Sequence, residues 1–204
     1  MILDRKVCMV TGAGSGIGRT TALHMAREGA TLVLVGRTQS KVASVAELIQ
    51  SQGGTAAPYG LDVSDRDSIF SMMDQVEKVY GRIDVLLNNA GHSSPHRRLL
   101  NTPPEEIESV ISSNLLGTIY CSQAVLPGML KRDSGTIINV ASMAGIEPGL
   151  MGGMIYSTVK ASIIAFTKFL NSEFAKTNIR ATVVSPGEIA TPALDRRPVP
   201  PNEE

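Results

Sequence analysis

The stretch TGAGSGIG, residues 11–18, has a glycine at every second position and lies between two different sequence patterns. Before it, Val7 to Val10 is a short apolar run typical of a buried strand, and after it Arg19 to Arg27 carries apolar residues at helical spacings. The glycines therefore lie in a turn from a strand into a helix, where backbone N–H groups and the positive end of the helix dipole are available to an anion. A tight turn without a ligand is the alternative for this segment taken alone.

The composition favours a single soluble domain. The chain has 204 residues, of which 43% are hydrophobic, and Lys plus Arg equals Asp plus Glu at 19 each, so no broad charge field favours nucleic acid or an anionic membrane. Cys8 and Cys121 form neither a disulfide framework nor a metal-ligand pattern. The start MILDRKV is no targeting signal, and no apolar run approaches the ~18 residues of a membrane span. We therefore expect a cytoplasmic protein with a small-molecule partner and no metal.

Short apolar runs alternate with longer amphipathic segments along the whole chain. After the first run, the expected strands are TLVLVG from residue 31, TAAPYGLDV from 55, RIDVLLNNAG from 82, GTIINVAS from 135 and IRATVVSPG from 179. The expected helices are 16–29, 39–52, 65–80, 103–131 and 155–177. This alternation predicts a doubly wound α/β fold, in which a parallel sheet has helices on both faces and ligands bind beyond the carboxyl ends of the strands.

Four further stretches fall at those carboxyl ends. They are LLNNAG at residues 86–91, INVAS ending at Ser142, the Tyr156-Ser-Thr-Val-Lys160 segment, and SPGEIATP at 185–192. Tyr156 and Lys160 are four apart and therefore share one face of a helix. Each stretch has an ordinary interpretation by itself, because Asn and Gly favour turns and a Tyr–Lys pair is commonly a half-buried ring beside a solvated lysine.

Taken together, these segments resemble the short-chain dehydrogenase/reductase family, from the first expected strand to the sixth. The family's glycine motif, T-G-x-x-x-G-x-G, is met by Thr11, Gly12, Gly16 and Gly18, with Gly14 as an extra glycine. The resemblance implies a Rossmann-like sheet and a nicotinamide dinucleotide whose pyrophosphate lies on backbone N–H groups of this turn. The contacts that it implies are Thr11, Gly12, Gly14, Ser15, Gly16, Ile17 and Gly18 for the phosphates; Arg37 and Thr38 for the 2′ position; Asp62 and Val63 for the adenine; Asn89, Ala90 and Gly91 for the ribose neighbourhood; and Tyr156, Lys160, Pro186, Gly187, Ile189 and Thr191 for the nicotinamide and its ribose.

The expected catalytic residues follow from the chemistry of hydride transfer. Reducing a carbonyl requires a proton on the carbonyl oxygen, and a phenol with a pKa of about 10 donates and accepts protons poorly at neutral pH. Lys160 supplies a positive charge that favours the phenolate of Tyr156, and it has donors for the nicotinamide ribose. Ser142 can donate a hydrogen bond to the carbonyl oxygen. By resemblance, Asn114 in SSNLLG holds a water that relays protons from Lys160.

The choice between NADP and NAD depends on the end of the second expected strand, in VLVGRTQSK at 33–41. A site selective for NAD places a carboxylate there, whereas a site for the 2′-phosphate of NADP is suited to an arginine. The residues present are Gly36, Arg37 and Thr38, with no acid, so we predict NADPH rather than NADH. Ser15 departs from the pattern, because many NADP-using relatives carry a second basic residue in the glycine turn. A solvated Arg37 at the end of a strand is the alternative.

The expected substrate is a ketone or an aldehyde, and 3-oxoacyl compounds are among the candidates. The residues near the expected site suggest a partly apolar pocket with a polar lip: Met143, Met151, Met154, His92, Ser93, Ser94 and His96. We interpret His92 and His96 as solvated loop residues, because Tyr156 already fills the acid role and no Cys, Asp or Glu cluster surrounds the two histidines.

The carboxyl-terminal end raises a separate expectation. A domain over 1–192 is followed by a Pro-rich charged tail over 193–204. Members of the family usually continue with a substrate-covering loop, a helix and a seventh strand, so we expect the sheet to end at the sixth strand. A homodimer or homotetramer would then form through 103–131 and 155–177. A cofactor-binding but inactive protein with a sensing or scaffolding role is the alternative to an active NADPH-dependent reductase.

Overall fold

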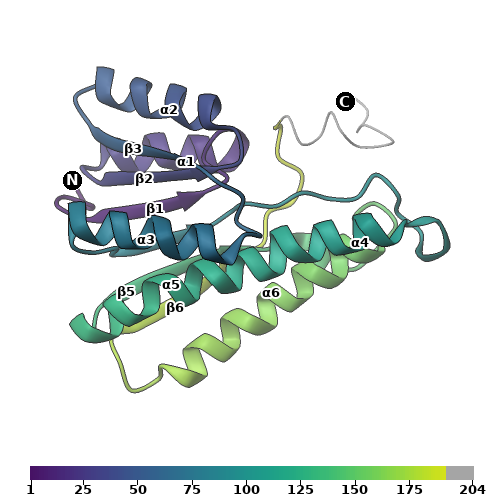
Figure 1. The fold of residues 1–204 in the computed structure, drawn as a ribbon. Helices are drawn as coiled ribbons and strands as arrows, with labels where there is room; N and C mark the ends of the chain where they lie inside the picture. Colours follow the sequence, from purple (N-terminus) through teal and green to yellow (C-terminus); the bar gives the residue numbers. More distant parts are fainter. Residues whose placement is uncertain (192–204) are drawn as a thin grey trace.

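Residues 1–191, which the computed structural model describes, form a parallel six-stranded sheet with helices on both faces (Figure 1). The strands are β1 Val7–Thr11, β2 Thr31–Gly36, β3 Thr55–Gly60, β4 Val85–Asn88, β5 Gly135–Val140 and β6 Ile179–Val184. The α-helices are α1 Gly16–Arg27, α2 Gln39–Ser51, α3 Arg66–Tyr80, α4 Pro104–Val110, α5 Gly117–Arg132 and α6 Met154–Glu173; the 3₁₀ helices are η1 Leu99–Asn101 and η3 Met143–Gly145, and η2 Ile111–Leu116 is a π-helix. The predicted doubly wound α/β fold is confirmed, and the predicted tail over 193–204 lies outside the described residues.

The strand order is β3-β2-β1-β4-β5-β6. The first three strands are added outward from β1 on one side and the last three outward from β4 on the other, so the strand order reverses between β1 and β4. Cys8 of β1 pairs with Leu32 of β2 on one side and with Val85 of β4 on the other. In open parallel sheets the point of reversal leaves a crevice beyond the carboxyl ends of the two strands. The glycine turn after β1 and the asparagines after β4 therefore lie at the same place on the sheet edge.

The core consists of two apolar layers, one on each side of the sheet. Val7 and Met9 of β1 pack into the layer formed with α3 and α5, whereas Cys8 and Val10 pack into the layer formed with α1 and α2. Because both faces of β1 are buried, the strand is apolar without interruption, as the sequence pattern predicts. Figure 1 shows α1 and α2 on one side of the sheet and α3, α5 and α6 on the other.

The long helix predicted over 103–131 is interrupted by a π-helical segment. α4, η2 and α5 follow one another without a break, and η2 contains Asn114. The hydroxyl of Ser113 donates to the carbonyl of Ser109, and that of Thr118 donates to the carbonyl of Asn114. Hydroxyls that bond carbonyls one turn back compete with the regular helical ladder, and short π segments commonly occur at functional sites.

The helix predicted over 155–177 ends earlier, at Glu173. The hydroxyl of Thr177 donates to the carbonyl of Phe174, and the backbone N–H of Asn178 donates to the carboxylate of Asp133 at the end of α5. These bonds turn the chain into β6. The prediction was too long because helical periodicity does not reveal a turn that is held by a distant carboxylate.

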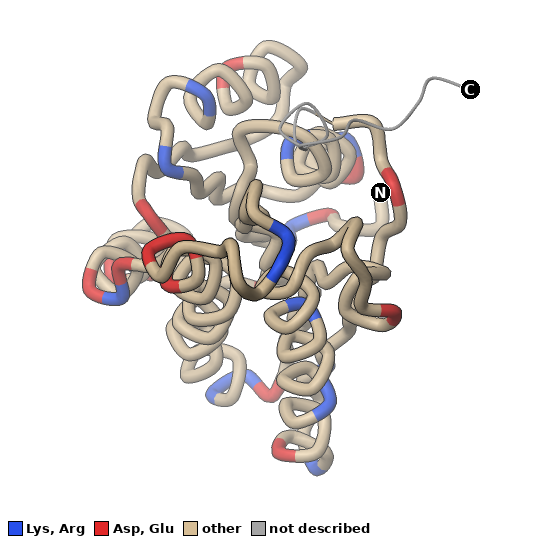
Figure 2. Tube along the Cα trace, turned by 90° about the vertical axis from the view of Figure 1, so that its right-hand side faces the viewer, with Lys and Arg blue, Asp and Glu red and all other residues tan. Residues whose placement is uncertain are grey.

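Acidic and basic residues are mixed along the described chain, and Figure 2 shows no continuous basic face in its view. Within residues 1–191, no helix is both long enough and apolar enough to cross a membrane.

Candidate functional site

A cavity of about 470 Å³ opens at the carboxyl edge of the sheet, where the ends of all six strands and the first turn of α6 meet. Most of the residues singled out from the sequence line it: Gly12, Gly14, Ser15, Gly16, Ile17, Arg37, Thr38, Asp62, Val63, Asn89, Ala90, Gly91, Ser142, Tyr156, Lys160, Pro186, Gly187, Ile189 and Thr191. Thr11, Gly18 and Asn114 do not line it. They are buried beside the cavity, and they contact the backbone segments that form its wall.

The glycine turn fits a phosphate group. Gly16, the first residue of α1, has φ +52°, a conformation that L side chains rarely adopt. Ser15 occupies the N-cap position without a hydrogen bond from its side chain, whereas at the start of α3 the carboxylate of Asp65 accepts the N–H of Ser68. The amino end of α1 thus carries no side-chain cap, and it has no acidic residue in its first turn. Such an end favours an anion.

Gly18 lies where the turn touches α1 most closely. A Cβ at this position would lie 2.4 Å from the carbonyl oxygen of Gly12 and 2.5 Å from the amide nitrogen of Asn89. Both distances are far below a normal contact, so the position accepts only glycine without movement of the backbone. This contact brings the first turn of α1 against the end of β1.

Thr11 and Asn89 join the ends of the two central strands. The Thr11 hydroxyl accepts the backbone N–H groups of Asn89 and Ala90, each at 3.0 Å, and the Asn89 amide donates to the carbonyl of Thr11 at 3.1 Å. Thr11 is almost completely buried. In the structure it positions the asparagine turn, which explains why it does not line the cavity.

Asn114 is fully buried and holds the loop that follows β4. Its Oδ1 accepts the N–H of His92 at 2.8 Å, and its Nδ2 donates to the carbonyl of the same residue at 2.7 Å. The amide therefore makes two bonds to one backbone unit. The π segment provides the position from which Asn114 reaches this loop.

The interpretation of His92 as a solvated loop residue is met only in part, because the residue is partly exposed but is also hydrogen-bonded in the cavity wall. Its ring is half-buried in the cavity wall, with Nδ1 3.0 Å from the Ser113 hydroxyl and Nε2 3.2 Å from the Ser109 hydroxyl. His96 is about half exposed and pairs with Glu106 at 2.9 Å. In the sequence, the only sign of the His92 position is the pair Ser109 and Ser113, four residues apart on one helix face. This sign becomes useful only when the loop of His92 is known to lie against that helix.

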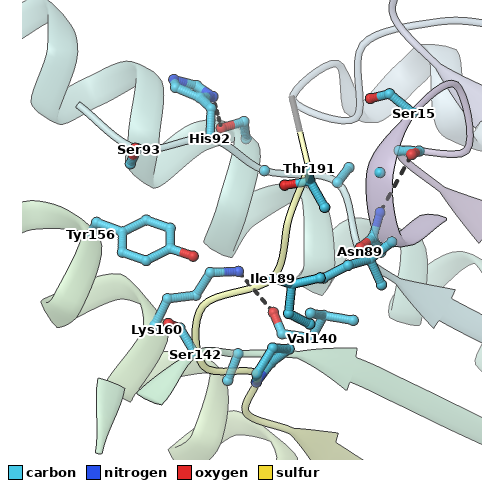
Figure 3. Close-up of a pocket in the computed structure, with 18 of the residues that line it drawn as sticks. Ser15, Asn89, His92, Ser93, Val140, Ser142, Tyr156, Lys160, Ile189 and Thr191 are labelled. Carbon is cyan, nitrogen blue, oxygen red and sulfur yellow. Dashed lines mark hydrogen bonds between the residues drawn. The ribbon is translucent and has the colours of Figure 1, made fainter. Parts of the chain in front are cut away.

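Tyr156, Lys160 and Ser142 come together from two elements. Tyr156 and Lys160 extend from α6 toward the loop that carries Ile189, and Ser142 follows β5 (Figure 3). Lys160 Nζ lies 5.5 Å from the centre of the Tyr156 ring and donates to the carbonyl of Val140 at 2.7 Å. The Ser142 hydroxyl accepts the N–H of Ala144 and so caps η3. The expected catalytic side chains except Asn114 thus face one cavity.

Gly145 sets the separation between the segment after β5 and α6. A Cβ on Gly145 would lie 2.6 Å from the backbone carbon of Lys160 and 2.7 Å from the backbone nitrogen of Ala161. The backbone of η3 therefore packs directly on the backbone of α6. This contact fixes Ser142 relative to Tyr156.

Burial lowers the pKa of Lys160 from its ordinary value to about 8. The side chain is only 4% exposed, and desolvation disfavours its charged form. Near neutral pH the amine is still mostly protonated. Its positive charge lies beside the phenol of Tyr156 and is little screened by water.

This pKa predicts how stability changes with pH. The unfolded chain, with an ordinary lysine pKa, binds this proton more tightly than the folded chain, so between pH 8 and 10.5 the contribution of Lys160 to the free energy of unfolding rises with pH. Lys160→Met removes the group. We expect the difference in unfolding free energy, wild type minus variant, to rise by about 2 kcal/mol from pH 7 to pH 9.5, measured by urea denaturation. A constant difference would show that the lysine is not desolvated.

Lys41 is a cavity residue that the sequence did not indicate. It lies near the start of α2 and lines the cavity together with Arg37, and a Cβ on Gly14 would lie 2.9 Å from the Lys41 Cβ. A second, smaller hollow continues from this point and is lined by Gly14, Ser15, Arg19, Ser40, Lys41, Ser44 and Val45. The glycine turn thus has a basic residue beside it, supplied by the next helix rather than by the turn itself.

The loop that carries Arg97 and the loop that carries Gly152 form the other end of the cavity, away from Lys41. Arg97 joins them, because its guanidinium donates to the carbonyl of Gly152 at 2.8 Å and its own carbonyl accepts the N–H of Met154 at 2.9 Å. Met143 and Met151 line the cavity as expected, whereas Met154 packs into a core cluster. Of the polar lip, His92 and Ser93 line the cavity, whereas Ser94 and His96 do not.

Comparison with known proteins agrees with this geometry. Residues 6–199 match the family model described as short chain dehydrogenase. The chain is 40% identical over 198 residues to the 3-oxoacyl-[acyl-carrier-protein] reductase FabG of Thermotoga maritima, covering 97% of this chain and 80% of that one. It is similar to a metagenomic short-chain oxidoreductase in complex with NADP, with a TM-score of 0.87, 32% identity and coverage of 93% and 85%. It is also similar to a 3-oxoacyl-[acyl-carrier protein] reductase with bound NAD from Brucella melitensis, with a TM-score of 0.87, 33% identity and coverage of 93% and 75%.

Proposed function

The chain belongs to the short-chain dehydrogenase family and is an NAD(P)-dependent dehydrogenase or reductase, and from that premise we propose that it reduces a ketone or an aldehyde with NADPH. The observation that carries the proposal is that Tyr156, Lys160 and Ser142 line the same cavity as the phosphate turn. A reactive carbonyl in that cavity would have a proton donor, a cation and a hydroxyl donor beside it.

In the proposed reaction the three side chains have different tasks. When bound, the nicotinamide supplies the hydride. Tyr156 donates a proton to the carbonyl oxygen, and Ser142 donates a hydrogen bond to the same oxygen as negative charge develops on it. The charge of Lys160 favours the phenolate that Tyr156 leaves behind, and a second role of its donors is to hold the nicotinamide ribose.

We propose a supporting role for Asn114. Its amide is bonded to His92, and through that bond it fixes the loop at the cavity wall. That Asn114 holds a water, and that this water relays protons from Lys160, stays a prediction from the resemblance. A solvent-isotope effect on kcat that is lost in Asn114→Ala would support it.

Preference for NADPH is part of the proposal. Arg37 and Lys41 both line the end of the cavity beside β2, and the sequence from Gly36 to Lys41 contains no acid that would accept a ribose 2′-hydroxyl. Two cations suit a 2′-phosphate, and an arginine can bind it through two parallel hydrogen bonds. Lys41 takes the place of the basic residue that Ser15 does not supply.

Arg37→Ala is expected to weaken NADPH binding by one to a few kcal/mol, on the order of a charge-assisted hydrogen bond, and to leave NADH almost unchanged. Lys41→Ala should act in the same direction with a smaller effect, since an ammonium binds as a point charge. Calorimetric titration with both cofactors measures this, and Lys78→Ala, on the distant helix α3, is the control. Equal losses for NADPH and NADH would make Arg37 a structural residue.

The activity itself is tested by following NADPH oxidation with ketones, aldehydes and 3-oxoacyl thioesters. Turnover of at least one class that depends on Tyr156 would support the proposal. Tight NADPH binding without turnover of any class would contradict it.

We also propose that the protein forms a homodimer or homotetramer through 103–131 and 155–177. Phe169 on α6 supports this, because an aromatic side chain that is 59% exposed is suited to an interface. Light scattering of wild type and Phe169→Glu tests it.

A cytoplasmic location is proposed because Cys8 and Cys121 are free and buried, as is usual where thiols stay reduced. The mixed charge in Figure 2 supports a small-molecule substrate rather than nucleic acid or a membrane surface.

A further inference from the structure

Arg97 is a half-buried cation in the wall of the cavity. It lies on the loop after β4, and Figure 3 shows His92 and Ser93 of that loop above the Tyr156 ring. The guanidinium donates to the carbonyl of Gly152, and the stem of the side chain packs on Gly153, where a Cβ would lie 2.6 Å from the Arg97 Cδ. The charge is therefore held at a defined place rather than free to move into solvent.

Of the other charged residues of the cavity wall, all but Glu188 have places in the proposed cofactor site or reaction. The charged lining residues are Arg37, Lys41, Asp62, Arg97, Lys160 and Glu188. The first three follow β2 and β3 and belong to the adenosine end. Lys160 belongs to the catalytic group, and Glu188 lies on the exposed loop after β6, between two residues proposed to hold the nicotinamide. Arg97 remains, at the end of the cavity where the carbonyl substrate would lie.

A structural role alone does not require an arginine at this position. The contact to the carbonyl of Gly152 needs only an N–H donor, and a neutral donor would not carry a charge that is costly to bury. An arginine differs from such a donor in one useful respect, because its planar fork binds carboxylate and phosphate oxygens through parallel hydrogen bonds. Met143 and Met151 line the cavity close by, and their thioether side chains suit the hydrocarbon part of a substrate.

We propose that Arg97 binds an anionic group of the substrate, so that the preferred substrates are carbonyl compounds with a carboxylate or a phosphate near the reacting carbonyl. This inference rests on the proposed function and names the substrate class of the same site. The anion lies against the loop from β4, and the hydrocarbon lies against the methionines. The charge of Arg97 then selects substrates, while Tyr156 and Ser142 act on the carbonyl.

The test uses pairs of compounds that differ only in the anionic group. Such pairs are 4-oxopentanoate with its methyl ester, 2-oxo-4-phenylbutanoate with its ethyl ester, and dihydroxyacetone phosphate with dihydroxyacetone. For at least one pair, the wild type is expected to have a kcat/KM at least about 10-fold higher for the anionic member, the size of one charge-assisted hydrogen bond. The carboxylate and phosphate pairs distinguish the two kinds of anion. Calorimetric titration of the NADP⁺-loaded protein with the preferred anion provides a readout without turnover.

Arg97→Gln is expected to abolish the preference, because it lowers kcat/KM for the anionic member much more than for the neutral member. Arg97→Lys should retain part of the preference, since it keeps the charge. Arg98→Gln is the matched control, because Arg98 is exposed, adjacent and outside the cavity lining. Unchanged NADPH affinity in each variant shows that the fold is intact.

Three outcomes would overturn the inference. Equal kcat/KM for the members of every pair would show that no anion is selected. Equal loss for charged and neutral members in both Arg97→Gln and Arg97→Lys would show that Arg97 only supports the loops. If Arg98→Gln reduced the preference for the anionic member as much as Arg97→Gln, the preference would come from the general electrostatic field and not from a specific contact. In all three cases the wild type would still oxidise NADPH with neutral carbonyls, whereas failure of the proposed function itself would appear as no oxidation by the wild type with any compound.

Discussion

Tyr156→Phe is expected to lower kcat by roughly 10²- to 10⁴-fold, the usual contribution of a positioned acid or base, and to change the Kd for NADPH by less than about 2-fold. The substitution removes the hydroxyl that donates the proton and keeps the ring beside Lys160 Nζ, which lies 5.5 Å from the ring centre. The phosphate turn lies on other elements, so cofactor binding should persist. Steady-state rates and calorimetric titration of the same preparation measure both quantities.

Tyr59→Phe is the matched control for this substitution. Tyr59 is on β3 and lies outside the cavity lining, so the same loss of a hydroxyl should leave kcat unchanged. A Tyr156→Phe variant that keeps most of the wild-type kcat would remove Tyr156 from the role of proton donor. A variant that loses NADPH binding as well would show that the phenol mainly holds the cofactor.

Gly18→Ala is expected to abolish measurable NADPH binding and to destabilise the fold by about 1–3 kcal/mol or more, the usual cost of overpacking. The added methyl would lie 2.4 Å from the Gly12 carbonyl oxygen, and this atom belongs to the backbone of the turn, so relief requires the turn to move away from α1. The N–H groups at the start of the helix and those of the turn would then no longer converge on one phosphate. Urea denaturation and calorimetric titration measure the two effects.

The control for this substitution is Gly149→Ala, because a Cβ at position 149 meets no heavy atom within 4 Å. It should change neither stability nor affinity by more than a few tenths of a kcal/mol. NADPH binding of normal affinity by Gly18→Ala would show that the turn adapts without cost. The proposed phosphate site would then need another explanation.

The sequence predicted the centre of the sheet well because β1 and β2 are buried on both faces. A run such as Val7 to Val10 then has no polar interruption, and the glycines that follow it mark where the strand ends. The same logic located the cavity, since the carboxyl ends of parallel strands meet at one edge. Helix boundaries were less accurate, because the end of α6 depends on Asp133, which is distant in sequence.

The residues that the sequence did not reveal are those whose role depends on contacts between loops. Lys41 lies beside the glycine turn because α2 packs against it, and Arg97 reaches Gly152 on a different loop. His92 is held by two serines of a helix that begins later in the chain. In each case the side chain alone is an ordinary surface residue, and only the packing of separate elements gives it a position in the site.

The contact of Gly145 with α6 has a consequence for directed evolution of this enzyme. Because two backbones touch there, any larger residue at 145 would push Ser142 away from Tyr156, so a saturation library that includes position 145 would consist mainly of inactive clones. Met143 and Met151 border the same cavity, are 41% and 70% exposed, and leave that spacing untouched. Libraries restricted to these two methionines should therefore give variants with altered substrate range while the chemical step is retained.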